Sequence, residues 1–187
     1  DRAEILLEAN PDSAYILLNE VKTPDRLNER QFARWCMLYC RAADKLFKDM
    51  LYTEQLDRAL VWYKSHGAAE QQAWMGLYLG RSYVKDKLFI PAMKAYSDAL
   101  SLAKEKYLYD VAGYICSYMA DLYTYTGQRS EERRKFEEAA EFFKQAGNER
   151  SYAFALRDVA KTWAFDDSLS LALHYMLIAD SVITRFQ

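Results

Sequence analysis

The sequence predicts an all-α protein, a solenoid of about nine or ten helices stacked as antiparallel hairpins. Residue types return every 40 positions, which indicates internal repeats. Within each repeat, apolar and small residues lie three and four positions apart, as they do on one face of an α-helix. The hydrophobic share is 51%, but only six residues are glycine and three are proline, the balance of an ordered helical protein. A hairpin with apolar flanks buries them only against the next hairpin, so such repeats stack.

The elements follow in order along the chain. Residues 3–9 predict a short helix, and Asn10, Pro11 and Asp12 are typical of a second helix start. Pro24 ends that helix, and Gly67 is a C-terminal capping signal. Four helix pairs follow, namely 28–47 with 53–65, 68–85 with 89–105, 107–126 with 129–146, and 149–164 with 168–186.

The first helix of each later repeat carries a small residue followed three positions later by an aromatic residue. The small residue lets a second helix approach closely, and the aromatic ring fills the space beside that contact. These pairs are Gly80 with Tyr83, Ala120 with Tyr123, and Ala160 with Trp163.

The second repeat resembles the tetratricopeptide repeat (TPR) family. The six positions that carry the likeness are Leu79, Gly80, Tyr83, Ala92, Tyr96 and Ala99. The resemblance covers roughly residues 12–187 and implies a right-handed α-solenoid. The first full unit departs from the pattern, with Ala43 at the aromatic place and Tyr52 at the alanine place. The usual unit has about 34 residues, and we expect the longer period to lengthen the helices rather than the loops.

We expect one repeat domain over residues 1–187, which begins with a partial unit at 1–27. The hairpins are expected at 28–67, 68–106, 107–147 and 148–187. Because the chain begins at Asp1 without a methionine, we expect it to be a fragment of a longer chain. A signal peptide, a membrane helix or a DNA-binding domain could flank it.

Composition and motifs exclude several function classes. The net charge is −2, which gives no reason to expect nucleic acid on this domain, and no apolar run is long enough for a membrane span. The three cysteines, Cys36, Cys40 and Cys116, are expected to be small buried core residues rather than metal ligands. The chain shows no phosphate loop and no nucleophile with a nearby base, so we expect neither an enzyme nor a cofactor.

The TPR resemblance implies that the first helix of each hairpin lines a concave groove that binds a protein or peptide partner. Transferred by alignment, the groove residues are Arg34, Arg41, Trp74, Arg81, Tyr114, Asp121, Phe154, Arg157 and Lys161. Aromatic rings and guanidinium groups suit an extended peptide that has apolar side chains and a carboxylate. Three alternatives stay open: aromatic residues that pack between hairpins, basic residues that are merely solvated, and a groove for a small ligand or sugar.

The last predicted helix, 168–186, is apolar around most of its circumference, whereas a solenoid normally ends on a helix with a polar outer face. We therefore expect either a continued array beyond Gln187 or a cover from a partner chain, as in a homodimer.

The Asn-Pro-Asp-Ser-Ala opening at 10–14, the long repeats and the tyrosine-rich helices look like repeat domains of bacterial envelope proteins. That resemblance implies a lipoprotein or a periplasmic sensory domain. A cytoplasmic location is the alternative.

Overall fold

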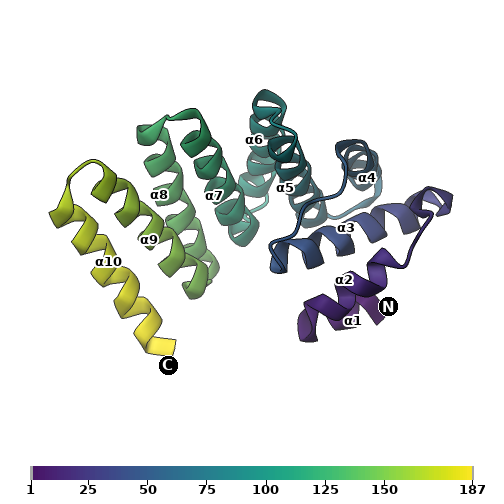
Figure 1. The fold of residues 1–187 in the computed structure, drawn as a ribbon, viewed down its shortest axis with the longest axis horizontal. Coiled ribbons are helices and arrows are strands. Elements are labelled where there is room, and N and C mark those ends of the chain that lie inside the picture. Colours follow the sequence, from purple (N-terminus) through teal and green to yellow (C-terminus); the bar gives the residue numbers. More distant parts are fainter. Residues whose placement is uncertain (1, 187) are drawn as a thin grey trace. The chain divides into compact units, whose positions relative to one another are not determined.

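The computed structural model describes residues 2–186, so Asp1 and Gln187, the outermost residues of the expected domain, lie outside the described residues. Within that range the chain folds into ten α-helices and two short 3-10 turns and contains no strand (Figure 1), which confirms the predicted all-α class. The elements are α1 (Arg2–Ala9), α2 (Pro11–Asn19), η1 (Pro24–Arg26), α3 (Glu29–Lys45), α4 (Thr53–His66), α5 (Ala69–Lys85), α6 (Phe89–Glu105), α7 (Tyr109–Thr126), α8 (Arg129–Ala146), α9 (Glu149–Phe165), α10 (Leu169–Ile183) and η2 (Thr184–Phe186).

The helices form two compact units, Asp1–Ala95 and Tyr96–Gln187, and the division falls within α6. In the first unit, each helix from α1 to α5 packs on the next one along the chain. In the second unit, α7 packs on α8, α8 on α9, and α9 on α10. Packing between consecutive helices is the arrangement of a helical repeat array.

The 40-residue period arises from long helices joined by very short turns. First helices begin at residues 29, 69, 109 and 149, and the second helices α6, α8 and α10 begin at 89, 129 and 169. These helices have 15 to 18 residues. The expectation that the extra residues lengthen the helices is therefore confirmed.

The turns repeat as regularly as the helices. The N–H groups of Leu88, Gln128 and Ser168 donate to the carbonyl oxygens of residues 83, 123 and 163, at 2.9 to 3.0 Å. A bond of this kind closes a helix end and requires a left-handed residue just before the donor. Gly127 supplies that residue with a φ of 72°, whereas Lys87 adopts a φ of 59° without the freedom of glycine.

The first full unit departs from this geometry, at the place where the sequence pattern is degenerate. Residues 46–52 form a longer connection, so α4 begins at Thr53 instead of four residues earlier. Met50 and Leu51 are buried in this connection, and the Leu51 carbonyl oxygen accepts a bond from Ser82 Oγ at 2.8 Å. Tyr52 is consequently exposed and does not occupy the place of a repeat alanine.

The three helix ends that differ most from prediction lie in α2, at Gly67 and in the last helix. Helix α2 ends at Asn19, before the predicted break at Pro24. Gly67 caps α4, as predicted, but with an extended backbone rather than a left-handed one. The last helix ends at Ile183, and the η2 turn replaces its predicted final residues. Asn10 caps α2 through a 3.0 Å bond from the Ser13 N–H, which confirms the predicted start of that helix.

The repeat core contains the residues that define the period. Gly80, Ala120 and Ala160 are all buried, so the small-residue position is equivalent in three successive units. The cysteines are free and buried, as predicted. Burial raises the pKa of the Cys40 and Cys116 thiols to about 12, so both stay protonated at neutral pH and behave as apolar residues.

Candidate functional site

The predicted groove residues lie on the first helices of four successive hairpins. Arg34 and Arg41 belong to α3, and Trp74 and Arg81 to α5, so these four lie in the first unit. The second unit holds the other five, which are Tyr114 and Asp121 on α7 and Phe154, Arg157 and Lys161 on α9.

In the first unit, α1 supplies acidic partners to the predicted basic residues of α3. Arg34 forms an ion pair with Glu4 at 2.6 Å, and Arg41 forms one with Glu8 at 3.1 Å. Lys45 also donates to Glu8, at 2.7 Å, and this hydrogen bond lowers the pKa of the Glu8 carboxyl. The basic residues of α3 therefore join successive first helices to one another.

The predicted residues of α5 have similar structural partners. Arg81 forms an ion pair with Asp44 on α3, and both side chains are largely buried, with exposed fractions of 17% and 23%. The Trp74 ring stacks on Tyr78 with a centroid distance of 5.8 Å. Arg81 has the same repeat position as Arg41, 40 residues earlier, and each pairs with an acid of the preceding first helix.

In the second unit, Tyr114 contacts both the second helix of its own hairpin and the next first helix. Its ring meets Phe143 edge to face, with a centroid distance of 4.9 Å. Its hydroxyl lies 3.0 Å from Ser151 Oγ and accepts a bond from Asn148 at 3.4 Å. The packing alternative for the aromatic residues therefore describes Tyr114. Asp121 lies exposed on α7.

The predicted residues of α9 differ, because they remain on the surface and gather into one row. Lys161 and Arg157 are exposed, and Phe154 is 39% exposed. The structure adds Arg150 and Phe165, which is 57% exposed. Steps of three and four residues place all five on one face of the helix. We call this row the α9 stripe: Arg150, Phe154, Arg157, Lys161 and Phe165.

Basic side chains lie over both aromatic rings of the α9 stripe. The guanidinium carbons of Arg150 and Arg157 lie 5.7 and 4.9 Å from the centroid of Phe154. Lys161 Nζ lies 5.9 Å from the centroid of Phe165. A cation over a ring face is attracted by the ring's electrons, so the stripe presents apolar surface and positive charge together.

One acid, Asp158, lies beside the stripe and is half-buried. Its carboxylate is 3.9 Å from the Arg157 guanidinium, a distant and weak contact. Burial raises the pKa of Asp158, although the nearby charges of Arg157 and Lys161 oppose that rise. Asp158 therefore does not neutralise the basic side chains of the stripe, which can bind an external anion.

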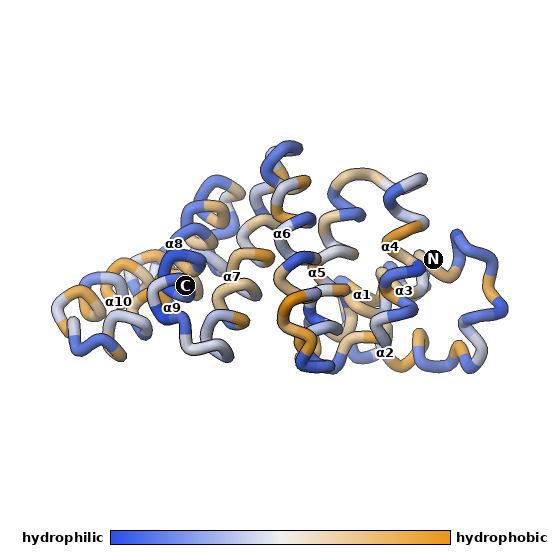
Figure 2. The backbone as a smooth tube through the Cα atoms, turned by 90° about the horizontal axis from the view of Figure 1, so that it is seen from above, coloured by the Kyte–Doolittle hydropathy of each residue, from blue (hydrophilic) through white to orange (hydrophobic). Residues whose placement is uncertain are grey.

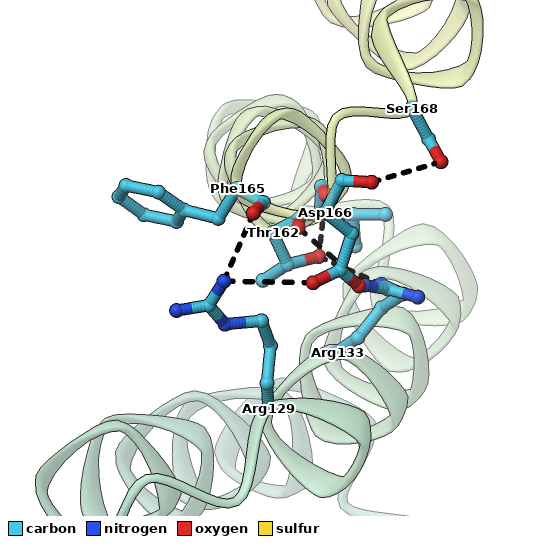
Figure 3. A network of polar contacts seen from close by, with 7 residues as sticks. Arg129, Arg133, Thr162, Phe165, Asp166 and Ser168 are labelled. Atoms are coloured by element: carbon cyan, nitrogen blue, oxygen red, sulfur yellow. Dashed lines mark hydrogen bonds and ion pairs between the residues drawn. The ribbon is translucent and has the colours of Figure 1, made fainter.

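A polar network fixes the end of α9 against α8 (Figure 3). Arg133 donates to Thr162 Oγ1 at 3.0 Å and forms an ion pair with Asp166. Arg129 donates to the Phe165 carbonyl oxygen at 3.0 Å, and its guanidinium carbon lies 5.2 Å from the centroid of the Phe165 ring. Arg129, a basic residue of α8, thus stands at the end of the stripe, and the network holds the Phe165 backbone in place.

Sequence reasoning missed Arg150 and Phe165. Both could have been found by extending the helical spacing four residues to either side of Phe154 and Lys161. The His, Cys, Asp and Glu side chains of residues 2–186 form no group that could hold a metal ion. Over the same residues, no helix combines the length and the hydropathy that crossing a bilayer requires.

No family model matches this sequence, and no curated protein is similar to it in sequence. Solved structures do resemble it in three dimensions. The apo form of RapI superposes with a TM-score of 0.74 and 13% identity over 98% of this chain and 68% of that one. A putative kinesin light chain from Podosopora anserina, with nearly identical TPR-like repeats, gives 0.67 and 12% identity over 99% and 92%. BtubC (BKLC) from P. vanneervenii gives 0.65 and 13% identity over 98% and 78%. At such identities the likeness concerns the fold.

Proposed function

We propose that this chain, which has the TPR-like repeat fold that its sequence predicts, is a non-enzymatic scaffold that binds a protein or peptide partner. The observation that carries the proposal is the α9 stripe, where exposed rings and basic side chains share one helix face. Its position on a first helix, where the TPR resemblance implies a binding groove, supports the same choice.

The proposed ligand is an extended acidic peptide that also carries apolar side chains. Carboxylates would meet Arg150, Arg157 and Lys161, because charge-assisted hydrogen bonds to guanidinium groups are strong and directional. Apolar side chains would cover the exposed edges of Phe154 and Phe165. Rigid aromatic groups and arginine are the residues that most often dominate binding energy in protein interfaces.

Fluorescence anisotropy with two labelled peptides tests the proposal. One peptide alternates glutamate with leucine and phenylalanine, and the other has lysine in place of each glutamate. We expect the acidic peptide to bind more tightly, and Arg157→Glu with Lys161→Glu to weaken its binding at least ~10-fold through charge repulsion. Added salt should weaken the interaction as well, because the stripe is exposed.

The matched control is Lys94→Glu with Lys144→Glu, which makes the same change in net charge at exposed lysines of α6 and α8. This control should bind nearly as the parent protein does. Equal losses in both double variants would mean that net charge alone governs binding. Unchanged binding in the Arg157 and Lys161 variant would refute the proposed surface.

The small-ligand alternative has its own outcome in a thermal-shift screen. A sugar or small aromatic ligand that raises the melting temperature, with no response to the acidic peptide, would favour that alternative over peptide binding.

The envelope setting implied by the resemblance of residues 10–14 and the long repeats stays a prediction. The sequence that flanks Asp1 and Gln187 in the complete gene product tests it. A signal peptide or lipid-anchor motif upstream, or a membrane helix downstream, is the expected finding.

A further inference from the structure

The α9 stripe divides into two sites, each built around one exposed aromatic ring. We call the first the Phe154 site, and it consists of Phe154, Arg150 and Arg157. The guanidinium carbons of the two arginines lie 5.7 and 4.9 Å from the ring centroid. Asp158 stays 3.9 Å from the Arg157 guanidinium, so both arginines can meet carboxylates of a ligand.

The second site combines residues of two helices, and we call it the Phe165 site. Phe165 and Lys161 belong to α9, and Arg129 reaches the ring from α8. Lys161 Nζ lies 5.9 Å from the ring centroid, and the Arg129 guanidinium carbon lies 5.2 Å from it. Each site therefore offers one aromatic ring and two cations to a ligand.

The two sites differ in charge, and the helices that pack on α9 contribute to the difference. In Figure 2, α8 is mainly hydrophilic, whereas α10 is mainly hydrophobic. Helix α8 adds Arg129 to the Phe165 site. Arg129 also lies 3.5 Å from the Asp166 carboxylate (Figure 3), which neutralises part of its charge. The Phe154 site is thus the more strongly basic of the two.

Helix α9 also fixes the spacing within and between the sites. Phe154 and Phe165 are eleven positions apart, which is about three helical turns, so both rings lie on one face. At about 1.5 Å per residue, the two positions are separated by roughly 16 Å along the helix axis. Arg150 and Lys161 each stand four positions before their ring, or roughly 6 Å along the axis. No single ligand residue spans both rings, so a ligand that fills both sites needs two anchors.

We infer that the partner carries two anchors on one side of an extended chain, about four or six residues apart. Each anchor is an apolar residue with an acidic residue two positions away. The apolar residue covers a phenylalanine ring of the stripe, and the acidic residue meets the cations beside that ring. The inference rests on the proposed function, because it specifies how an extended acidic peptide occupies the α9 stripe.

The dimensions of an extended chain give these separations. Alternate residues face the same side, and each residue advances ~3.3 Å. An acid two positions from an apolar residue is thus ~7 Å from it, close to the cation-to-ring spacing of ~6 Å in each site. Anchors four or six positions apart are separated by roughly 13 or 20 Å, and flexible side chains absorb the remaining ~3 Å. Anchors two positions apart, at ~7 Å, fall far short of the second ring.

Fluorescence anisotropy with a set of labelled peptides tests the inference. Three serine-based peptides hold two leucines two, four or six positions apart, each leucine with a glutamate two positions away. A fourth peptide has one leucine and the same number of glutamates. We expect the four- and six-position peptides to bind at least ~10-fold more tightly than the single-anchor peptide, because the second anchor binds intramolecularly. The two-position peptide cannot span both sites, so its affinity should stay within ~3-fold of the single-anchor value.

Variants of the two rings assign the anchors to their sites. Phe165→Ala should remove the advantage of the second anchor but leave the single-anchor affinity unchanged, because one anchor prefers the more basic Phe154 site. Phe154→Ala should weaken both kinds of peptide at least ~5-fold. The Phe165 ring is 57% exposed and Arg129 bonds to its backbone carbonyl oxygen, so Phe165→Ala should stay folded by circular dichroism. The matched control is Tyr107→Ala, which removes a 74% exposed ring in the turn before α7 and should change neither affinity.

The outcomes separate this inference from the proposed function. Equal affinities for the single-anchor peptide and the four- and six-position peptides would overturn the inference and leave the proposed function standing. Tighter binding by an alanine-based peptide with anchors eleven positions apart, which gains helical circular dichroism on binding, would overturn the extended register. If no peptide of the set binds, the inference and the proposed function both fail.

Discussion

At the scale of single residues, the short turns impose a backbone conformation that few side chains adopt readily. Phe47, Lys87, Gly127 and Asp167 stand 40 residues apart, and all have φ values between 54° and 72°. A left-handed backbone costs an ordinary residue about 1 kcal/mol or more, whereas glycine adopts it without steric strain. At Lys87 and Asp167 an ordinary residue accepts this strain because the turn must close within three residues.

Replacing Lys87 with glycine should therefore stabilise the protein. Relief of strain exceeds the extra entropy that glycine gives to the unfolded chain, so we expect a gain of roughly 0.5 to 1 kcal/mol in urea denaturation. The converse change, Gly127→Ala, should cost about 1 kcal/mol at the same repeat position. A loss of stability on Lys87→Gly would mean that the Lys87 side chain makes a favourable contact that outweighs the strain.

At the scale of helices, hydrogen bonds and ion pairs join neighbouring helices of the second unit. Arg133 reaches from α8 to Thr162 and Asp166, and Lys104 and Lys135 both meet Glu138. Burial alone would raise the pKa of Glu138, but its bonds to the two lysines outweigh this effect and lower the pKa. Each network joins a first helix to a second helix or one second helix to another.

The Asp166 contact predicts a specific response to acid. The hydrogen bond from Arg133 lowers the pKa of Asp166 below its ordinary value. A group with a lowered folded pKa adds stability above its unfolded pKa, near 4, and loses it as the pH falls through the folded value. Stability differences between the parent chain and Asp166→Asn should therefore be largest at neutral pH and shrink below about pH 4.

Urea denaturation at a series of pH values measures that difference. Asp167→Asn is the control, because Asp167 has no ion pair within the described residues. Its difference from the parent should change little over the same interval. A constant difference for Asp166→Asn down to about pH 2 would show that the bond with Arg133 contributes no net stability.

At the scale of the whole molecule, contacts between consecutive helices predict that stability depends on the number of repeats. Residues 68–187 comprise three complete hairpins, the number that helical repeats generally need to fold. We expect this shorter chain to fold, with a melting temperature roughly 5 to 15 °C lower. The loss arises because the cut removes partners of Ser82 and Arg81, namely Leu51 and Asp44.

Thermal unfolding followed by circular dichroism tests this expectation, and residues 1–67 serve as the comparison. That piece contains the degenerate first unit and should be less helical than in the intact chain. If residues 68–187 prove unfolded while residues 1–67 fold, the first unit would be the nucleus on which the later repeats depend.

The sequence by itself determined the helices, their period and the buried small residues. These features follow from spacings of three, four and forty residues, which are local or strictly repeated, so they can be read without knowing any distance in space. The α9 residues Phe154, Arg157 and Lys161 lie on one helix, in the predicted segment 149–164. That these residues bind a partner stays a prediction.

Only the tertiary structure decided which basic residues are committed to partners within the chain. Arg34 and Arg41 meet Glu4 and Glu8, about 30 residues earlier, because α1 packs beside α3. Nothing local distinguishes Arg41 from Lys161, which holds the same repeat position and is exposed. An ion pair depends on the neighbouring helix that faces a residue, and that neighbour is fixed by packing between helices rather than by the periodicity within one.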